Sequence, residues 1–435
     1  MTGVHFVGPR DTNVAWDGAH LYEARDFYPG ARSLVGLRGA AASVCGAATT
    51  GWRVVRDPLG INKLFWAQDA RGGVHFAARP KVLVEGGHRF EDVTSVPPGA
   101  VVDITGSGQP AAIETVVPSS WFTTPRDPAP SVEAIGGQVR TSIARYLSAI
   151  ASQLRPEEVY VCLSGGLDSS GIAAMAKEIF ASTIAVSFDL KRPRSDPSDD
   201  RVAGARVADD LGLPMLDVSV TDDELLDHMD TVLVEGVDWR DFNVHAGLVN
   251  AALAAGIAAR AGGRRALVLT GDLANEFLVD YEPESYRGQT YYRLPRLRAG
   301  ALRTSLVRGL DTCNREIGIF SAYGLDVVQP YAVAVDAYMA LPEDFLGEAE
   351  RKNALDRVIF GSLIPEHVYA RKKVRAQVGS EEVGGVLATC LDRGVDQSWL
   401  RRRFASLHGV EDDAELDRFM RAGRYRSAVP TVQET

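Results

Sequence analysis

The chain has 435 residues, of which 46% are hydrophobic and 24% are charged, and its formal net charge is −10. This composition is typical of a globular protein and excludes a chain that is disordered along most of its length. The acidic balance argues against nucleic acid and anionic membranes as partners, because such partners bind positive surfaces. A chain of this length is too long for a single hydrophobic core, so two domains are expected.

The cysteines and the N-terminal sequence bear on localisation. Cys45, Cys162, Cys313 and Cys390 lie far apart and show no spacing typical of a metal site or a redox pair. The N-terminus has no basic stretch followed by an apolar core, and we expect no window that approaches an uncharged apolar span of about 18 residues. We therefore expect a cytoplasmic, reduced protein without a membrane span.

The first part of the chain is predicted to be mostly β-structure. Short apolar or alternating runs lie between glycine and proline turn signals: RSLVGLRG, WRVVRD, LFWAQD, VHFAA and AVVDIT. A stretch rich in Pro, Ser and Thr follows at 118–130 and is typical of a linker. We expect one domain over 1–117, the linker, and a second domain over 131–435.

After the linker, the pattern changes to strands that alternate with helices. The run SVEAIGGQVRTSIARYLSAIASQL has helical spacing, and VYVCL, TIAVSF and RALVLTG have strand composition. This alternation predicts an α/β domain, in which helices cover a parallel sheet. Because ligands bind beyond the carboxyl ends of the strands in such sheets, the strand ends are the candidate site.

The segment SGGLDSS, residues 164–170, joins the first of these strands to a helix. Gly165 and Gly166 allow the backbone to approach an anion, and the turn N–H groups, three serine hydroxyls and the helix N-terminus can all donate to it. The loop is therefore predicted to bind phosphate, although neither GxxxxGK[ST] nor GxGxxG is present. Asp168 beside a phosphate indicates a bridging divalent cation, and we expect magnesium. The alternative is a plain Asp/Ser cap on a helix.

These residues resemble the asparagine synthetase superfamily of ATP pyrophosphatases, which includes β-lactam and carbapenam synthetases. The loop alone would also fit tRNA-thiolating enzymes and NAD or GMP synthetases. Three N-terminal segments resemble the superfamily's glutaminase domain: RDPLGINKLF (56–65), HFAARPKVLV (75–84) and VPPGAVVDI (96–104). The resemblance implies a mostly-β remnant of an Ntn-type glutaminase domain, followed by an adenine nucleotide α-hydrolase-like synthetase domain with a PP-loop.

The resemblance also implies the residues that bind ATP and metal. The implied nucleotide contacts are Leu163, Ser164, Gly165, Gly166, Asp168, Ser169, Ser170, Val186, Thr270, Gly271 and Lys373. Asp168 is the first implied magnesium ligand. Asn275 stands where the family has a second metal-binding aspartate, so either metal affinity is lower or Asp272 or Glu276 takes over.

Two residues are implied to act in catalysis. Asp272 replaces a family glutamate that in β-lactam synthetase is a tyrosine of the base dyad, so it is the candidate base. Lys373, in YARKKV, matches the lysine of the family's WRxKxxF segment, which contacts phosphates and stabilises the acyl-transfer transition state. The alternative for this run is a solvated basic face.

Other positions depart from the family. Thr2 stands where glutamine-hydrolysing members have cysteine, and other glutaminase segments are absent, so we expect no hydrolysis of glutamine. YGLDVVQPYAV (323–333) has lost the arginine and the final aspartate of the WGVExRxPFLD segment of asparagine synthetases, so the substrate need not be aspartate. The histidines show no metal-ligand spacing, so zinc is not expected.

The resemblance implies an amide-forming ligase that uses ATP and Mg²⁺, with a role in specialised metabolism such as antibiotic biosynthesis. A carboxylate substrate would be adenylated with release of pyrophosphate, and an amine substrate would then displace AMP. The alternative is a pseudoenzyme that binds only a nucleotide or a partner. A tRNA-thiolating enzyme fits less well, because it needs a basic face and catalytic cysteines. A homodimer is left open.

Overall fold

The computed structural model describes residues 14–23, 37–47, 49–115, 117, 121, 130–191, 198–308, 315–371 and 385–420. The N-terminal part contains β1 (Val14–Trp16), β2 (Leu21–Glu23), β3 (Arg38–Ala40), β4 (Ala42–Ala47), β5 (Gly51–Arg56), β6 (Phe65–Gln68), β7 (Val74–Ala77), α1 (Pro80–Glu85), β8 (Thr94–Ser95), β9 (Ala100–Ile104) and β10 (Pro110–Thr115). The C-terminal part contains the strands β11 (Glu158–Cys162), β12 (Thr183–Leu190), β13 (Met215–Val220), β14 (Ala266–Leu269), β15 (Glu284–Tyr286), β16 (Gln289–Tyr291) and β17 (Asp326–Val328).

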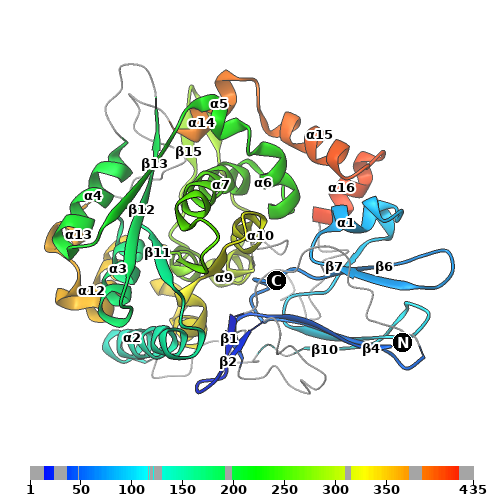
Figure 1. Ribbon diagram of the computed structural model, residues 1–435, viewed down its shortest axis with the longest axis horizontal. Helices are drawn as coiled ribbons and strands as arrows, with labels where there is room; N and C mark the ends of the chain where they lie inside the picture. The colour runs from blue at the N-terminus through cyan, green and yellow to red at the C-terminus, as the bar shows by residue number, and fades with distance from the viewer. Residues whose placement is uncertain are drawn as a thin grey trace.

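Most helices of the C-terminal part lie around these strands, whereas its last two helices lie beside the N-terminal part (Figure 1). The helices are α2 (Val132–Ala149), α3 (Leu167–Ile179), α4 (Asp199–Leu211), α5 (Asp222–Leu226), α6 (Met229–Gly236), α7 (Asp241–Ala261), α8 (Ala274–Leu278), α9 (Ala299–Val307), α10 (Arg315–Ala322), α11 (Val335–Met339), α12 (Ala349–Phe360), α13 (Glu366–Ala370), α14 (Val386–Asp392), α15 (Gln397–Leu407) and α16 (Asp413–Met420).

The N-terminal part consists of antiparallel sheets, as its alternating sequence predicts. The described strands pair in the orders β10-β9-β5-β4, β7-β6-β8 and β2-β1-β3. Alternation in β5 turns Trp52 and Val54 to one face, where they join Trp66 and Phe76 in a buried cluster. The rings of Trp52 and Phe76 meet edge to face at 5.4 Å. Side chains from two sheets thus share one small core.

Arg56 and Asp57, the first two residues of the RDPLGIN turn (56–62), make hydrogen bonds within that turn. Asp57 is buried and accepts hydrogen bonds from the backbone N–H groups of its neighbours, including Ile61 at 2.9 Å and Asn62 at 3.0 Å. Arg56, also buried, donates to the carbonyl oxygens of Gly60 at 2.8 Å and Asn62 at 2.6 Å. Burial raises the pKa of Asp57, and the surrounding donors oppose that shift. This motif therefore stabilises a loop.

The C-terminal part is a parallel sheet of order β13-β12-β11-β14-β17 within the described residues. Its inner strands β12 and β14 are buried along their whole length, because helices cover both faces. Figure 1 shows α7 on one face and α3 with α4 on the other. The predicted α/β fold class is confirmed. The edge strands β13 and β17 were not foreseen.

Helix α7 corrects one expectation. Residues 242–259 carry no Asp, Glu, Lys or Arg, and α7 is long and apolar enough to cross a membrane by length and composition. The expectation that no such window exists is therefore wrong. More than half of that window is buried inside the protein, because α7 packs against the sheet, α6 and α10. A helix that is apolar on most sides is typical of a core helix.

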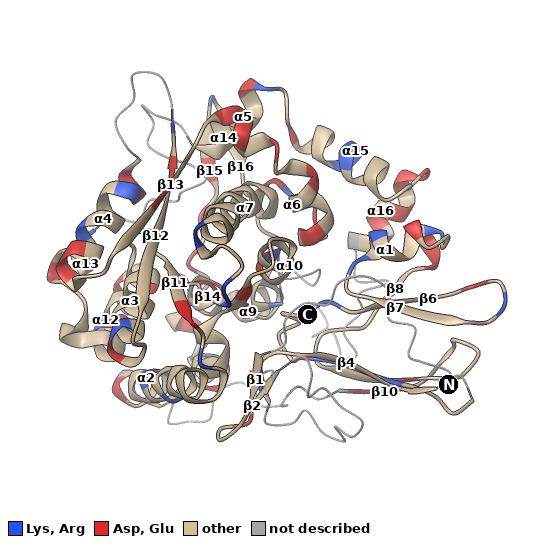
Figure 2. Ribbon diagram, viewed as in Figure 1, with Lys and Arg blue, Asp and Glu red and all other residues tan. Residues whose placement is uncertain are grey.

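The C-terminal helices return to the N-terminal part. The ring of Phe90 lies 6.2 Å from that of Phe404 on α15 and 4.8 Å from that of Phe419 on α16. Figure 2 shows basic residues on α15 near acidic residues on α16, and Arg401 pairs with Asp417 there at 2.8 Å. Arg403 on the same helix pairs with Asp230 on α6, so two arginines of α15 have acidic partners. The proposed linker lies mostly outside the described residues, so its bounds stay a prediction.

Candidate active site

A cavity of about 950 Å³ opens at the carboxyl ends of β11, β12 and β14. Side chains from the loops after these strands share it with residues of α7 and α12. Of the predicted site residues, the cavity is lined by Leu163, Ser164, Gly166, Asp168, Ser169, Val186, Gly271, Asp272 and Asn275. Gly165, Ser170, Thr270 and Glu276 are described but are not among its lining residues. Lys373 lies outside the described residues.

The loop after β11 contains a glycine whose backbone adopts the left-handed conformation. Gly165 has φ +73, and a Cβ atom at this residue would lie 2.5 Å from the backbone carbon of Ala203. The hydroxyls of Ser164 and Ser169 lie 3.1 Å apart, and the backbone N–H of Gly166 donates to Ser164 Oγ at 3.3 Å. Helix α3 begins at Leu167, so its N-terminal N–H groups follow directly. The loop therefore concentrates donors at a helix start, where anions bind well.

The loop after β14 presses against this donor-rich loop. A Cβ atom at Gly271 would lie 2.8 Å from the backbone nitrogen of Ser169. Only glycine fits such a close approach of two backbones, so the two loops form one continuous surface. Thr270, just before it, is buried and donates its hydroxyl hydrogen to Glu316 Oε2 at 3.0 Å. Thr270 therefore supports a carboxyl group behind the cavity.

A buried lysine lies between the two loops. Lys352 on α12 is 6% exposed, and its Nζ donates to Asp168 Oδ2 at 2.9 Å, Asn275 Oδ1 at 2.5 Å and Asp280 Oδ2 at 3.1 Å. Burial lowers the pKa of Lys352, but Asp168, Asp356 and Asp280 raise it more, so the net shift is upward. The ammonium group stays charged and joins two of the predicted metal ligands.

Sequence reasoning missed Lys352, although helical spacing could have found it. Lys352, Leu355, Asp356 and Ile359 occupy positions i, i+3, i+4 and i+7 of α12, and all are buried. That spacing defines the inner face of a helix. A lysine on an inner face needs a partner.

Two charged residues of α10, Arg315 and Glu316, lie beside Asp272. Glu316 on α10 is fully buried and accepts a hydrogen bond from Gln329 Nε2 at 2.5 Å. Arg315 Nη2 lies 3.2 Å from Asp272 Oδ1 and 3.7 Å from Glu316 Oε1. Burial, followed by the charge of Asp272 and a hydrogen bond with it, raises the pKa of Glu316 well above its usual range. The predicted base thus has a second carboxyl group and a cation as neighbours.

Arg371 links the far side of the cavity to the phosphate loop. Its Nη1 donates to the carbonyl oxygen of Ser164 at 3.2 Å, and its Nη2 donates to Asp200 Oδ1 at 2.8 Å. Burial raises the pKa of Asp200 to about 6, while the hydrogen bond and charge of Arg371 oppose that shift. The YARKKV segment therefore begins at the phosphate loop.

One comparison with known proteins covers the two loops of this site. Residues 139–315, which include the phosphate loop and Asp272, match the asparagine synthase family. The match shows an asparagine synthase domain in this segment of the chain. No curated protein matches the chain.

Two solved structures are reported among those similar to the chain. NMN synthetase from Francisella tularensis shows 12% identity over 69% of this chain and 97% of that chain, with a TM-score of 0.33. NH3-dependent NAD synthetase from Campylobacter jejuni subsp. jejuni NCTC 11168 shows 14% identity over 34% of this chain and 61% of that chain, with a TM-score of 0.26.

The side-chain oxygen atoms of Asp168 and Asn275 are of the type that binds a magnesium ion. Asp168 Oδ1 is buried without a hydrogen-bond partner, and the Oδ1 atom of Asn275 binds the same ammonium group as Asp168. No group of three or more His, Cys, Asp or Glu side chains suited to a metal occurs in the described part of the chain. Magnesium commonly takes one or two carboxylates and completes its shell with phosphate and water, so two ligands suffice. Glu276 accepts a hydrogen bond from Tyr281 through Oε1 at 2.6 Å, while its Oε2 atom is buried without a hydrogen-bond partner, so its role as a metal ligand stays a prediction.

Stability of the protein should depend on pH through the buried Glu316. Its folded-state pKa lies above the ordinary value of 4.5, so the folded state binds this proton more tightly than the unfolded state. The wild-type protein therefore loses stability as pH rises from about 4.5 through the raised pKa. Because glutamine cannot ionise, the Tm of Glu316→Gln minus that of wild type should increase between pH 5 and pH 8.

Calorimetry at several pH values measures this difference. Glu366→Gln is the control, because Glu366 is an exposed partner of Arg357 with a lowered pKa. Its Tm difference from wild type should show no increase with pH. A flat difference for Glu316→Gln as well would mean that Glu316 is ionised throughout this range.

Proposed function

We propose that the protein is an ATP-dependent synthetase that joins a carboxylate to an amine through an acyl-adenylate. The observation that carries the proposal is the shared cavity, which brings the donor-rich loop after β11, the cation of Lys352 and the carboxylate of Asp272 together. The match of residues 139–315, which include both loops of the cavity, to the asparagine synthase family supports the use of ATP.

In the proposed first step, a substrate carboxylate oxygen attacks the α-phosphorus of ATP. The new P–O bond forms as the bond to pyrophosphate breaks, and negative charge accumulates on the departing phosphates. The N–H groups at the start of α3 and the ammonium of Lys352 would stabilise that charge. Magnesium, held by Asp168 and Asn275, would supply further positive charge at the phosphates.

In the proposed second step, an amine attacks the acyl carbon and AMP leaves. A primary amine has an ordinary pKa near 10.4 and must lose a proton before or during attack. Asp272 lines the cavity and would accept this proton. Arg315 would hold the Asp272 carboxylate in place, and Glu316 would lie behind it as a hydrogen-bond partner. The acyl C–O bond to AMP breaks as the tetrahedral intermediate collapses.

Carboxylate-dependent exchange between ATP and pyrophosphate tests the first step without knowledge of the amine. Wild-type protein is incubated with labelled pyrophosphate, ATP, magnesium and single acids from a chemically diverse library. We expect label in ATP only with particular acids. If no acid supports the exchange of pyrophosphate into ATP, although ATP is measured to bind, the proposal is contradicted.

The second candidate function is nucleotide binding without turnover. It is favoured by one observation: Lys352 donates to Asn275 Oδ1, the oxygen with which Asn275 would bind magnesium, and also to Asp168 Oδ2. This candidate predicts that ATP binds with equal affinity with and without magnesium. Calorimetric titration under both conditions distinguishes it from the synthetase.

A further inference from the structure

We infer that the N-terminal part is a clamp that positions α10, the helix that carries Arg315 and Glu316 beside Asp272. Its principal positioning residue is Arg79. The catalytic consequence of the clamp rests on the proposed function, whereas the clamp itself does not. The inference gives a role to the three N-terminal segments that the proposed chemistry leaves unused.

The first contact is at Gly318, in the middle of α10. A Cβ atom there would lie 2.2 Å from the backbone oxygen of Glu235 and 2.9 Å from both Arg79 Nη2 and Lys63 Nζ. Arg79 and Lys63 are 2% and 1% exposed. Two cationic side chains of the N-terminal part therefore touch α10 at a position where only glycine leaves room.

The second contact fixes Arg79 beside α10. Its Nε donates to Glu235 Oε2 on α6, and its Nη1 donates to the carbonyl oxygen of Ala78 at 2.9 Å. Both side chains of the ion pair are largely buried, and α6 packs directly against α10. Loss of one partner of a buried pair leaves an uncompensated charge, so this contact resists separation of the two parts.

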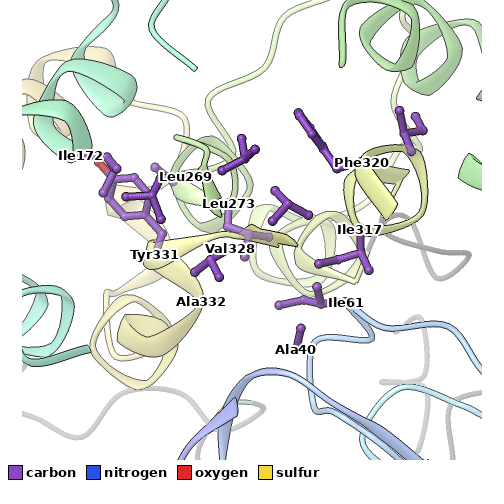
Figure 3. Packing of buried hydrophobic residues seen from close by; sticks show 14 of the residues in the cluster. Ala40, Ile61, Ile172, Leu269, Leu273, Ile317, Phe320, Val328, Tyr331 and Ala332 are labelled. Carbon is purple, nitrogen blue, oxygen red and sulfur yellow. The ribbon is translucent and has the colours of Figure 1, made fainter. Parts of the chain in front are cut away.

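Two further contacts flank the glycine contact. Ile61 from the RDPLGIN turn lies against Ile317, the residue that follows Glu316, and both belong to one continuous hydrophobic core (Figure 3). Arg308, which follows α9, is buried and donates through Nη2 to the carbonyl oxygen of Pro98 at 2.7 Å. The chain is therefore held on both sides of the α9–α10 connection.

These contacts come from all three glutaminase-like segments. Lys63 lies in 56–65, Arg79 in 75–84 and Pro98 in 96–104. Each segment contributes a contact to α10 or to the end of α9. A shift of α10 would move Arg315 away from Asp272, which it contacts at 3.2 Å. A misplacement of about 1 Å in a reacting constellation can cost about 100-fold in rate.

The test compares Arg79→Met with Arg38→Met in the full chain. Arg38 also pairs across the boundary between the two parts, with Asp336 on α11 at 2.7 Å, and makes no described contact with α10. Hydrogen–deuterium exchange over residues 315–322 should be at least about 10-fold faster in Arg79→Met and unchanged in Arg38→Met. Amide formation should fall about 10- to 100-fold in Arg79→Met, while pyrophosphate exchange stays within about two-fold of wild type.

Arg79→Lys should restore much of the amide-forming rate, because it keeps a cation beside Glu235. If Arg79→Met does not fold, Gly318→Ala disturbs the same contact from the α10 side and should give the same two changes. Unchanged exchange over 315–322 in the variants at these positions would overturn the clamp. Faster hydrogen–deuterium exchange over 315–322 together with normal amide formation would overturn the catalytic role of the clamp. If wild type adenylates no acid, the proposed function fails, and hydrogen–deuterium exchange alone still decides on the clamp.

Discussion

Replacing Asp168 with alanine should reduce carboxylate-dependent pyrophosphate exchange by at least about 100-fold and leave the protein folded. Asp168 lies in the first turn of α3 at the phosphate loop, and its Oδ1 atom has no hydrogen-bond partner. Removal of this side chain creates no apolar cavity, because its surroundings are polar. Lys352 keeps Asn275 and Asp280 as acceptors, so its charge stays compensated.

The Asp168→Asn variant separates two roles of this carboxylate. If Asp168 is a magnesium ligand, Asp168→Asn should be nearly as inactive as Asp168→Ala. Higher magnesium concentrations should then recover part of its pyrophosphate exchange. If Asp168 serves only as an acceptor for Lys352, an amide oxygen can replace it. Activity of Asp168→Asn close to wild type would therefore remove Asp168 from the metal site.

The strand ends of the site could be predicted because they depend on local sequence. An apolar run predicts a buried strand, and SGGLDSS marks the turn into a helix by its glycines and polar residues alone. The loop at Gly271 follows the same rule after β14. These features need no knowledge of which strands are neighbours.

Lys352 and Glu316 could not be located in the same way, because their roles depend on distant parts of the chain. Lys352 lies 184 residues from Asp168, and nothing near it in the sequence names its partners. Glu316 gains its raised pKa from burial against α10's neighbours and from Asp272. The uncharged window of α7 differs from these two residues, because residues 242–259 can be read directly from the sequence. Only the burial of that helix in the core needs the structure, since an apolar helix has the same composition in a core and in a membrane.

The N-terminal segments show a different limit of sequence reasoning. Their resemblance to a glutaminase domain drew attention to a lost activity, whereas the structure places Lys63 and Arg79 against α10. Contacts between two domains leave no periodic signal in either one. Glycine at position 318 is required by those contacts, although its sequence surroundings suggest an ordinary helix.

Replacing Lys352 with methionine should lower both stability and activity, for the same electrostatic reason. Methionine keeps most of the side-chain volume, so the change removes mainly the charge. Asp168 and Asp280 then face each other without the cation between them, which should cost about 3 kcal/mol in the free energy of unfolding. Exchange of pyrophosphate should fall at least about 100-fold, because the loop loses a cation where negative charge develops.

Arg351→Ala is the matched control, since Arg351 is the preceding residue on α12. Its ion pair with Asp344, at 2.9 Å, joins side chains that are 46% and 71% exposed. A surface pair of this kind contributes less than about 1 kcal/mol, so stability and exchange should stay near wild type. Chemical denaturation and exchange assays on both variants measure the contrast.

The double variant Lys352→Met, Asp168→Asn separates stability from chemistry. Removing the Asp168 charge together with the lysine relieves most of the repulsion, so the free energy of unfolding should recover by about 1–2 kcal/mol relative to Lys352→Met. Activity should not recover, because both the cation and the carboxylate are then absent from the phosphate loop. Recovery of exchange in the double variant would mean that Lys352 only neutralises Asp168, and that the phosphates are stabilised by other groups.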